Sequence, residues 1–110
     1  MQRFQANPNL VLEQEKDFQI GFLQGIFDAE GSIRLERRYV TVSSKNVKTI
    51  WVVIELLERL GLKIGKPFKD NNNVISIPFY GKENLVIFNK IIGFRHPEKK
   101  QRLELFINRV

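Results

Sequence analysis

Two acidic residues, Asp28 and Glu30, close an apolar segment and are the side chains in this sequence best placed for chemistry. If the segment is a helix, both acids stand at its C-terminal end, where the helix dipole disfavours further negative charge. A bound cation would offset that penalty. A divalent metal held there could polarise a phosphate, deprotonate water and stabilise a leaving oxygen, as phosphodiester hydrolysis requires. For an isolated pair of acids, however, two solvated side chains at a helix end are the simpler interpretation.

Two glycines, Gly21 and Gly25, lie four residues apart in the same segment and would share one helix face. A glycine inside a helix costs about 1 kcal/mol relative to alanine, so two on one face need a reason. Close approach of another backbone is such a reason, and that backbone belongs either to the same domain or to an identical helix of a second copy. We favour the second copy, because the helix has apolar residues on nearly all its sides. Two Glu30 carboxylates would then meet near the twofold axis, and a divalent metal would let both stay charged.

The composition limits the kind of metal and the kind of site. The chain has no cysteine, which excludes disulfides and thiolate metal sites. Its one histidine, His96, argues against imidazole clusters and a Ser-His-Asp triad, and its place before Pro97 is typical of a helix-capping residue. A metal would therefore be a hard ion such as Mg²⁺, held by carboxylates. Without a signal-peptide layout or an apolar run of about 20 residues, we expect an intracellular protein, cytoplasmic or organellar.

The charge is unevenly distributed along the 110 residues. The first 31 residues carry two basic and five acidic side chains, a net charge of −3. Residues 32–110 carry sixteen basic and seven acidic side chains, a net charge of +9. A basic body favours a polyanionic partner, because each lysine or arginine placed on a phosphate releases condensed counterions. Basic charge serves DNA and RNA equally and does not distinguish them.

The elements that must position these residues form one α+β domain. We predict helices over 16–29, 46–60, 82–92 and 97–108, and strands over 33–36, 39–43, 63–69 and 74–80. Residues 1–12 read as a loose arm, and we place the N-terminal arm as a whole at residues 1–15. The order predicts one antiparallel sheet covered by helices on one face, with alternate polar residues on the other. We expect Trp51 in the core, and Pro67 and Pro78 at edges or bulges of the sheet.

Residues 23–31 read LQGIFDAEG and resemble the nine-residue LAGLIDADG signature of homing endonucleases, with glutamate as the second acid. The segment from Ile92 to Leu103 looks like the C-terminal region of that family. The resemblance covers roughly residues 17–106 and includes one motif. It implies an αββαββα fold whose four-stranded antiparallel sheet forms a saddle on the DNA major groove. Because single-motif members form homodimers, it also implies a homodimer.

The resemblance assigns roles to individual positions. Gly21 and Gly25 match the interface glycines of the family, and Asp28 is placed with them at the dimer interface and helix end. Glu30 matches the essential metal-binding acid, with Ala29 beside it. Lys82 is the candidate for a lysine that organises solvent around the attacking water, although a surface lysine opening a helix explains it equally well. The saddle would place the following residues on bases or phosphates: Arg34, Glu36, Arg38, Thr41, Ser43, Lys66, Lys69 and Ser76.

The functional hypothesis that follows is a homodimeric, Mg²⁺-dependent endonuclease acting on double-stranded DNA. The alternative is the same fold used as a non-cleaving DNA-binding protein or as an RNA maturase. Glu30 favours the enzyme, since a binding protein has no need of that acid. The short hairpin between Ser32 and Ser44 departs from the longer strands usual in the family and would contact fewer base pairs. Lys99, Lys100 and Arg102 read more simply as the solvated face of the last helix than as a phosphate-binding patch.

Overall fold

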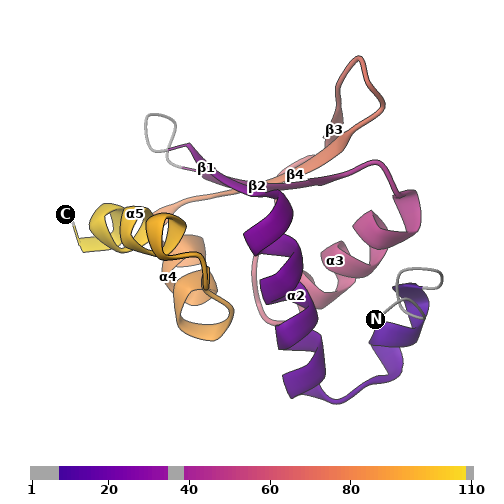
Figure 1. Ribbon diagram of the computed structural model, residues 1–110, viewed down its shortest axis with the longest axis horizontal. Helices are drawn as coiled ribbons and strands as arrows, with labels where there is room; N and C mark the ends of the chain where they lie inside the picture. The colour runs from indigo at the N-terminus through magenta and orange to yellow at the C-terminus, as the bar shows by residue number, and fades with distance from the viewer. Residues whose placement is uncertain (1–7, 35–38, 109–110) are drawn as a thin grey trace.

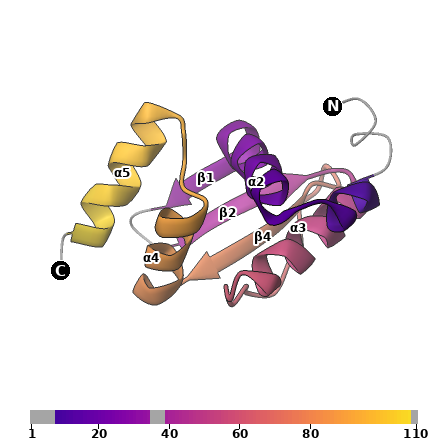
Figure 2. The same ribbon diagram turned by 90° about the horizontal axis from the view of Figure 1, so that it is seen from below.

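A four-stranded antiparallel sheet with helices on one of its faces makes up the fold (Figures 1 and 2). The computed structural model describes residues 8–34 and 39–108. The elements in chain order are η1 (Pro8–Glu13), α2 (Lys16–Glu30), β1 (Gly31–Arg34), β2 (Tyr39–Ser44), α3 (Val47–Arg59), β3 (Phe68–Lys69), β4 (Ile75–Tyr80), α4 (Lys82–Ile91) and α5 (Pro97–Asn108). This order of helices and strands confirms the prediction from the sequence. Among the described residues, none of the helices is long and apolar enough to span a membrane.

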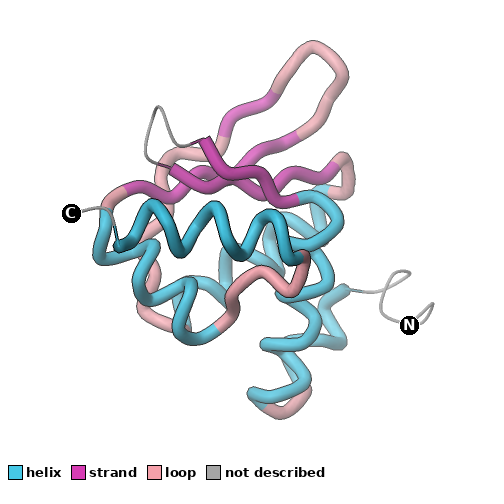
Figure 3. Tube along the Cα trace, turned by 60° about the vertical axis from the view of Figure 1, so that its left-hand side comes forward, coloured by secondary structure: helices cyan, strands magenta, loops and turns pink. Residues whose placement is uncertain are grey.

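The sheet has the strand order β1-β2-β4-β3, so the two hairpins meet through β2 and β4 at its centre. Val40 and Val42 of β2 pair with Phe79 and Ile77 of β4, and all four side chains are buried beneath the helices. The opposite face is uncovered, as Figure 3 shows with all the helices below the strands. The predicted division into a covered and an open face is therefore confirmed.

Helix α2 fixes the position of the acidic pair because its buried side is anchored in the core. Leu23 and Phe27 are fully buried, and the Phe27 ring lies 5.9 Å from Phe79 and 4.7 Å from Phe88, measured between ring centroids. The helix then passes directly into β1 at Gly31 without a connecting loop. An extra Cβ at Gly31 would collide with the carbonyl of Phe27 and lie 2.9 Å from the Phe94 ring. Close approach, rather than an unusual backbone angle, therefore requires glycine after Glu30.

Four expectations about the fold were wrong, and the first two concern Trp51 and the N-terminal arm. Trp51 is 65% exposed instead of buried. Helix α3 has apolar residues on most sides, and its buried face holds Val52, Val53 and Leu56 instead. The expected arm is wrong for Pro8–Glu13, which forms a 3₁₀ helix whose Val11 is fully buried; residues 1–7 lie outside the described part.

The third strand is also much shorter than predicted, since only Phe68–Lys69 of the range 63–69 is strand. Pro67 precedes this strand, as expected of an edge position. Pro78 lies on the inner strand β4, opposite Thr41, rather than at an edge. The carbonyl oxygen of Pro78 accepts from the N–H of Gly65 at 2.7 Å, so its ring nitrogen faces the same side, beyond the end of β3. The missing N–H therefore breaks no bond to β2.

Candidate active site and dimer face

One side of helix α2 is exposed and forms the wall of a groove of about 530 Å³. The residues that line the groove are Gly21, Phe22, Gly25, Ile26 and Ala29 from one side of α2, then Glu30, Ser43, Ser44, Thr49 and Arg95. The α2 residues recur at the spacing of a single helix face. This face joins small residues to two half-buried apolar side chains, Phe22 and Ile26, and leads toward Glu30. We call it the groove face of α2.

The two glycines of the groove face have no packing reason within the described part of the chain. A Cβ added at Gly21 would meet no atom within 4 Å, and one added at Gly25 would meet only Arg95 Nη2 at 3.8 Å. A Cβ would therefore be tolerated at either position. Tight packing of this helix face within its own domain, one of the two readings of the glycines, is therefore wrong. Among the described residues, no close contact offsets the helix-propensity cost of about 1 kcal/mol for each glycine.

Glu30, the last residue of α2, is exposed at the end of the groove. Among the described residues it has no hydrogen-bond or ion-pair partner. Its carboxylate offers the oxygen donors that Mg²⁺ takes. Within the described ranges of one chain, no three histidine, aspartate or glutamate side chains gather closely enough to hold a metal. Among the described residues Glu30 thus offers a single carboxylate, and a metal held there would need further oxygen ligands from elsewhere.

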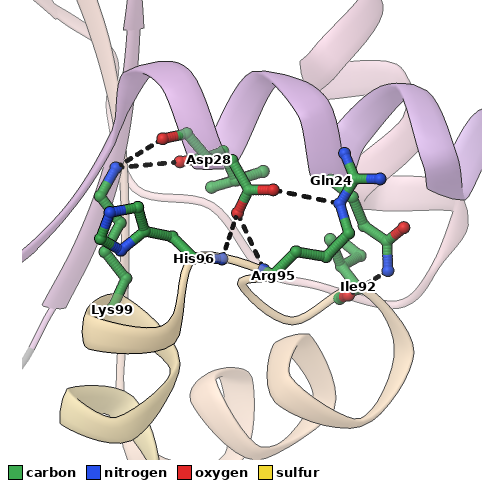
Figure 4. A network of polar contacts seen from close by, with 7 residues as sticks. Gln24, Asp28, Ile92, Arg95, His96 and Lys99 are labelled. Carbon is green, nitrogen blue, oxygen red and sulfur yellow. Dashed lines mark hydrogen bonds and ion pairs between the residues drawn. The ribbon is translucent and has the colours of Figure 1, made fainter.

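Asp28, by contrast, is engaged within the chain. Its carboxylate accepts hydrogen bonds from the backbone N–H groups of Arg95 and His96, at 2.8 and 3.1 Å, and from Arg95 Nε at 3.1 Å (Figure 4). Partial burial acts to raise the pKa of Asp28, but these donors and the charge of Arg95 outweigh it and hold the pKa below its usual value. Asp28 therefore ties the end of α2 to the segment between α4 and α5. Its additional role at a dimer interface stays a prediction.

Asp28→Asn should lower the free energy of unfolding by about 1–3 kcal/mol near neutral pH, because three hydrogen bonds lose their charged acceptor. The folded-state pKa is depressed, so the carboxylate stabilises the fold fully above the unfolded-state pKa of about 3.9. That contribution disappears as the pH falls through the folded-state pKa. Urea denaturation of both proteins between pH 7 and pH 2 should therefore show the difference narrowing in acid. A difference that stays constant down to pH 2 would contradict this account.

Gln24 and Lys99 complete the connection between α2 and the α4–α5 segment. Gln24 Nε2 donates to the carbonyl of Ile92 at 2.8 Å, and Lys99 Nζ donates to the carbonyl of Asp28 at 2.8 Å. Lys99 is half-buried, so its reading as part of a solvated helix face is wrong. Figure 4 shows Gln24 and Asp28 pointing from α2 toward the α4–α5 segment, and Lys99 reaching back to the end of α2. His96 precedes α5 and its carbonyl accepts from Lys100 N–H, which agrees with a capping position.

The open face of the sheet carries few charges among the residues described. Ser43 and Ser76 are partners across β2 and β4, and their hydroxyl oxygens lie 2.7 Å apart. Thr41 shares this face but is only 8% exposed. Lys66 and Lys69 are exposed. Phe68 pairs with Ser76 and shares the open face, whereas Lys69 pairs with Ile75 and points to the opposite side of the sheet.

The remaining residues expected on DNA are only partly covered by the structure. Arg34 ends β1, and its side chain is not described. Glu36 and Arg38 lie outside the described residues.

Two tyrosines on the open face were missed from the sequence. Tyr39 and Tyr80 are partners across β2 and β4, and their ring centroids lie 5.2 Å apart. Tyr80 is 51% exposed. The alternation of Tyr39 with Thr41 along the strand was a signal that could have identified the first of them.

Lys82 does not line the groove with Glu30. It opens α4 and borders a separate, shallow depression with Glu83, Val86 and Ile87. Its assignment as a solvent-organising lysine stays a prediction.

Comparison with known proteins identifies the family. A family model described as a LAGLIDADG-like domain matches residues 17–93. The chain is 30% identical over 111 residues to a glutamine–fructose-6-phosphate aminotransferase of Methanocaldococcus jannaschii, covering 96% of the chain and 10% of that protein. It is 28% identical over 104 residues to the homing endonuclease I-ApeI of Aeropyrum pernix, covering 93% of the chain and 47% of that protein. The chain thus spans less than half the length of either relative.

A solved structure supports the same assignment at the level of the fold. The archaeal intron-encoded homing endonuclease I-Vdi141I, complexed with DNA, matches with a TM-score of 0.53 and 24% sequence identity, over 84% of this chain and 66% of that one. The family match covers more than half of the chain, including the groove face, Glu30 and all four strands. The chain therefore belongs to the LAGLIDADG-like domain family.

Proposed function

We propose that this chain forms a homodimer that binds double-stranded DNA and hydrolyses it with the help of a divalent metal such as Mg²⁺. The observation that carries the proposal is the groove face of α2, where two glycines lead to Glu30; among the residues that the structure describes, nothing packs closely on the glycines and no side chain pairs with Glu30. The relatives support it, because I-ApeI is a homing endonuclease and the structure of I-Vdi141I contains DNA.

The groove face explains how two copies would cooperate. Two α2 helices can approach closely only where side chains are small, and Gly21, Gly25 and Ala29 provide such a strip. Packing along it would bring the two exposed Glu30 carboxylates together on the twofold axis. Their mutual repulsion would be relieved by cations held by the Glu30 carboxylate and the backbone carbonyl oxygen of the neighbouring Ala29. When bound, a divalent metal supplies Lewis-acid stabilisation of the phosphate and a more acidic water.

The open face of the sheet is the proposed DNA surface. Its described side chains offer hydroxyl groups at Ser43 and Ser76 and aromatic rings at Tyr39 and Tyr80. Such groups suit contacts to base edges, while the basic residues of the chain, which has a net charge of +6, suit phosphates. Two symmetry-related sites in a dimer would serve one strand each, so both strands would be cut.

The decisive experiment is cleavage of a plasmid library of randomised sites by the purified protein, with Mg²⁺ and separately with EDTA. We expect linear product enriched in particular sequences with Mg²⁺ alone. Cleavage that persists in EDTA would contradict metal dependence. Absence of cleavage on a library deep enough to contain a site would overturn the endonuclease, and the same protein would then be tested for binding to DNA and to structured RNA.

A further inference from the structure

Lys99 is the described side chain of α5 that reaches the end of α2. Its Nζ donates to the carbonyl oxygen of Asp28 at 2.8 Å and to that of Phe27 at 3.5 Å (Figure 4). The ammonium group also lies 5.8 Å from the centroid of the Phe94 ring. It is half-buried, whereas the next residue, Lys100, is exposed. Two adjacent lysines of one helix therefore occupy different environments.

The last turn of α2 needs such a donor. The final four carbonyl groups of a helix have no donor within the helix. Here the Phe27 carbonyl accepts from the N–H of Gly31, and Lys99 is the donor found for the carbonyl of Asp28. A positive charge at this end also opposes the negative end of the helix dipole, where Glu30 adds further negative charge. Lys99 thus stabilises the turn that carries Glu30 both by hydrogen bonding and by charge.

Because α2 continues directly into β1, the last helical turn sets the direction of the Glu30 side chain. Glu30 is the last residue of α2, and Gly31 is already paired in the sheet with Val42. No loop separates helix from strand, so the direction of the Glu30 side chain follows from the geometry of the last helical turn. The Phe94 ring that lies beneath the Lys99 ammonium also packs against Gly31. Lys99 therefore contacts the helical turn before Glu30 directly and reaches Gly31, after it, only through the Phe94 ring, and it does not line the groove.

We propose that Lys99 is a positioning residue for Glu30, holding the last turn of α2 so that the Glu30 carboxylate is presented at the groove for metal binding. This inference rests on the proposed function, because it takes Glu30 to be a metal ligand. Lys99 itself touches neither metal nor DNA in this role.

The test compares Lys99→Met with Lys100→Met, which removes the same charge from the neighbouring exposed position. Metal binding is followed without cleavage, by titrating the isotope-labelled protein with Mn²⁺ and measuring the paramagnetic broadening of the Gly31 and Ser32 amide signals. We expect Lys99→Met to need at least tenfold more Mn²⁺ than wild type, and Lys100→Met to need less than twofold more. Lys99→Arg, which keeps a cationic donor, should recover most of the loss.

Cleavage rates at increasing Mg²⁺ give the second readout. Lys99→Met should shift the half-saturating Mg²⁺ concentration at least tenfold, while DNA affinity measured in Ca²⁺ changes less than threefold. A purely structural role would lower the melting temperature and leave both metal titrations unchanged, which would overturn the proposal. Equal metal titrations for the Lys99→Met and Lys100→Met variants would overturn it as well.

The two proposals can fail separately. If wild type cleaves no DNA but binds Mn²⁺ beside Gly31, the endonuclease fails, and the Mn²⁺ comparison still decides the role of Lys99. If wild type cleaves DNA and Lys99→Met has normal metal titrations, only the positioning role fails. If wild type shows no Mn²⁺ effect at Gly31 and Ser32, Glu30 is not a metal ligand and the positioning role is refuted with it.

Discussion

Glu30→Gln is expected to lower the rate of DNA cleavage by about a thousandfold or more, because the metal supplies several kcal/mol of transition-state stabilisation. The amide keeps the size of the side chain but removes the charge that would hold a divalent cation. Folding should not change, since the exposed Glu30 has no hydrogen-bond or ion-pair partner among the described residues. Plasmid cleavage at saturating Mg²⁺ measures the rate, and thermal denaturation measures folding. Binding in Ca²⁺ measures DNA affinity, which should stay close to that of wild type.

The matched control is Glu58→Gln, on the exposed side of α3 and outside the groove. Both variants lose one negative charge, so any general effect on attraction to DNA should be the same in both. Glu58→Gln should cut at the wild-type rate. A Glu30→Gln protein that also cuts at that rate would remove Glu30 from the active site. A Glu30→Gln protein that unfolds would show a structural role that its exposure does not suggest.

The parts of the site that follow from local sequence were predictable. Helix α2 was expected over 16–29 and ends at Glu30, because its apolar run is bounded by Gly31 and the alternating strand residues that follow. The helix-propensity cost of Gly21 and Gly25 predicted a closely packed backbone from a second copy, and that packing stays a prediction; both glycines are exposed in the single chain. In α3, the same reasoning misplaced Trp51, since it lies in an unbroken apolar run, residues 50–54, in which periodicity does not show which side is buried.

The contacts that hold the end of α2 were not predictable. The bonds from Arg95 and Lys99 to Asp28 join residues 67 and 71 positions apart, and only the tertiary fold brings them together. An acid at the negative end of a helix does signal that a cation is needed nearby. It does not say whether that cation is a metal, Arg95 or Lys99. The structure shows that Arg95 and Lys99 bind Asp28, while Glu30 has no cationic partner among the described residues.

Gly25→Leu tests directly whether the groove face of α2 is the dimer interface that would bring two Glu30 side chains together. A leucine there should weaken dimerisation by at least about a hundredfold, because the bulk of the side chain would separate two backbones that glycine lets approach. Within one chain the change should be harmless. A Cβ at this position meets only Arg95 Nη2 at 3.8 Å, and the groove of about 530 Å³ has room for the side chain. Sedimentation over a range of protein concentrations measures the dimer.

Stability of the separated chain distinguishes loss of the interface from loss of the fold. Replacing glycine in a helix gains up to about 1 kcal/mol, so urea denaturation at dilutions where wild type is monomeric should show an equal or more stable variant. Lys48→Leu adds a leucine to an exposed position of α3 outside the groove and should leave the dimer intact. If Gly25→Leu dimerises like wild type, the interface lies elsewhere. Two Glu30 residues would then have no reason to meet, and the shared metal site would have to be abandoned even if DNA is cut.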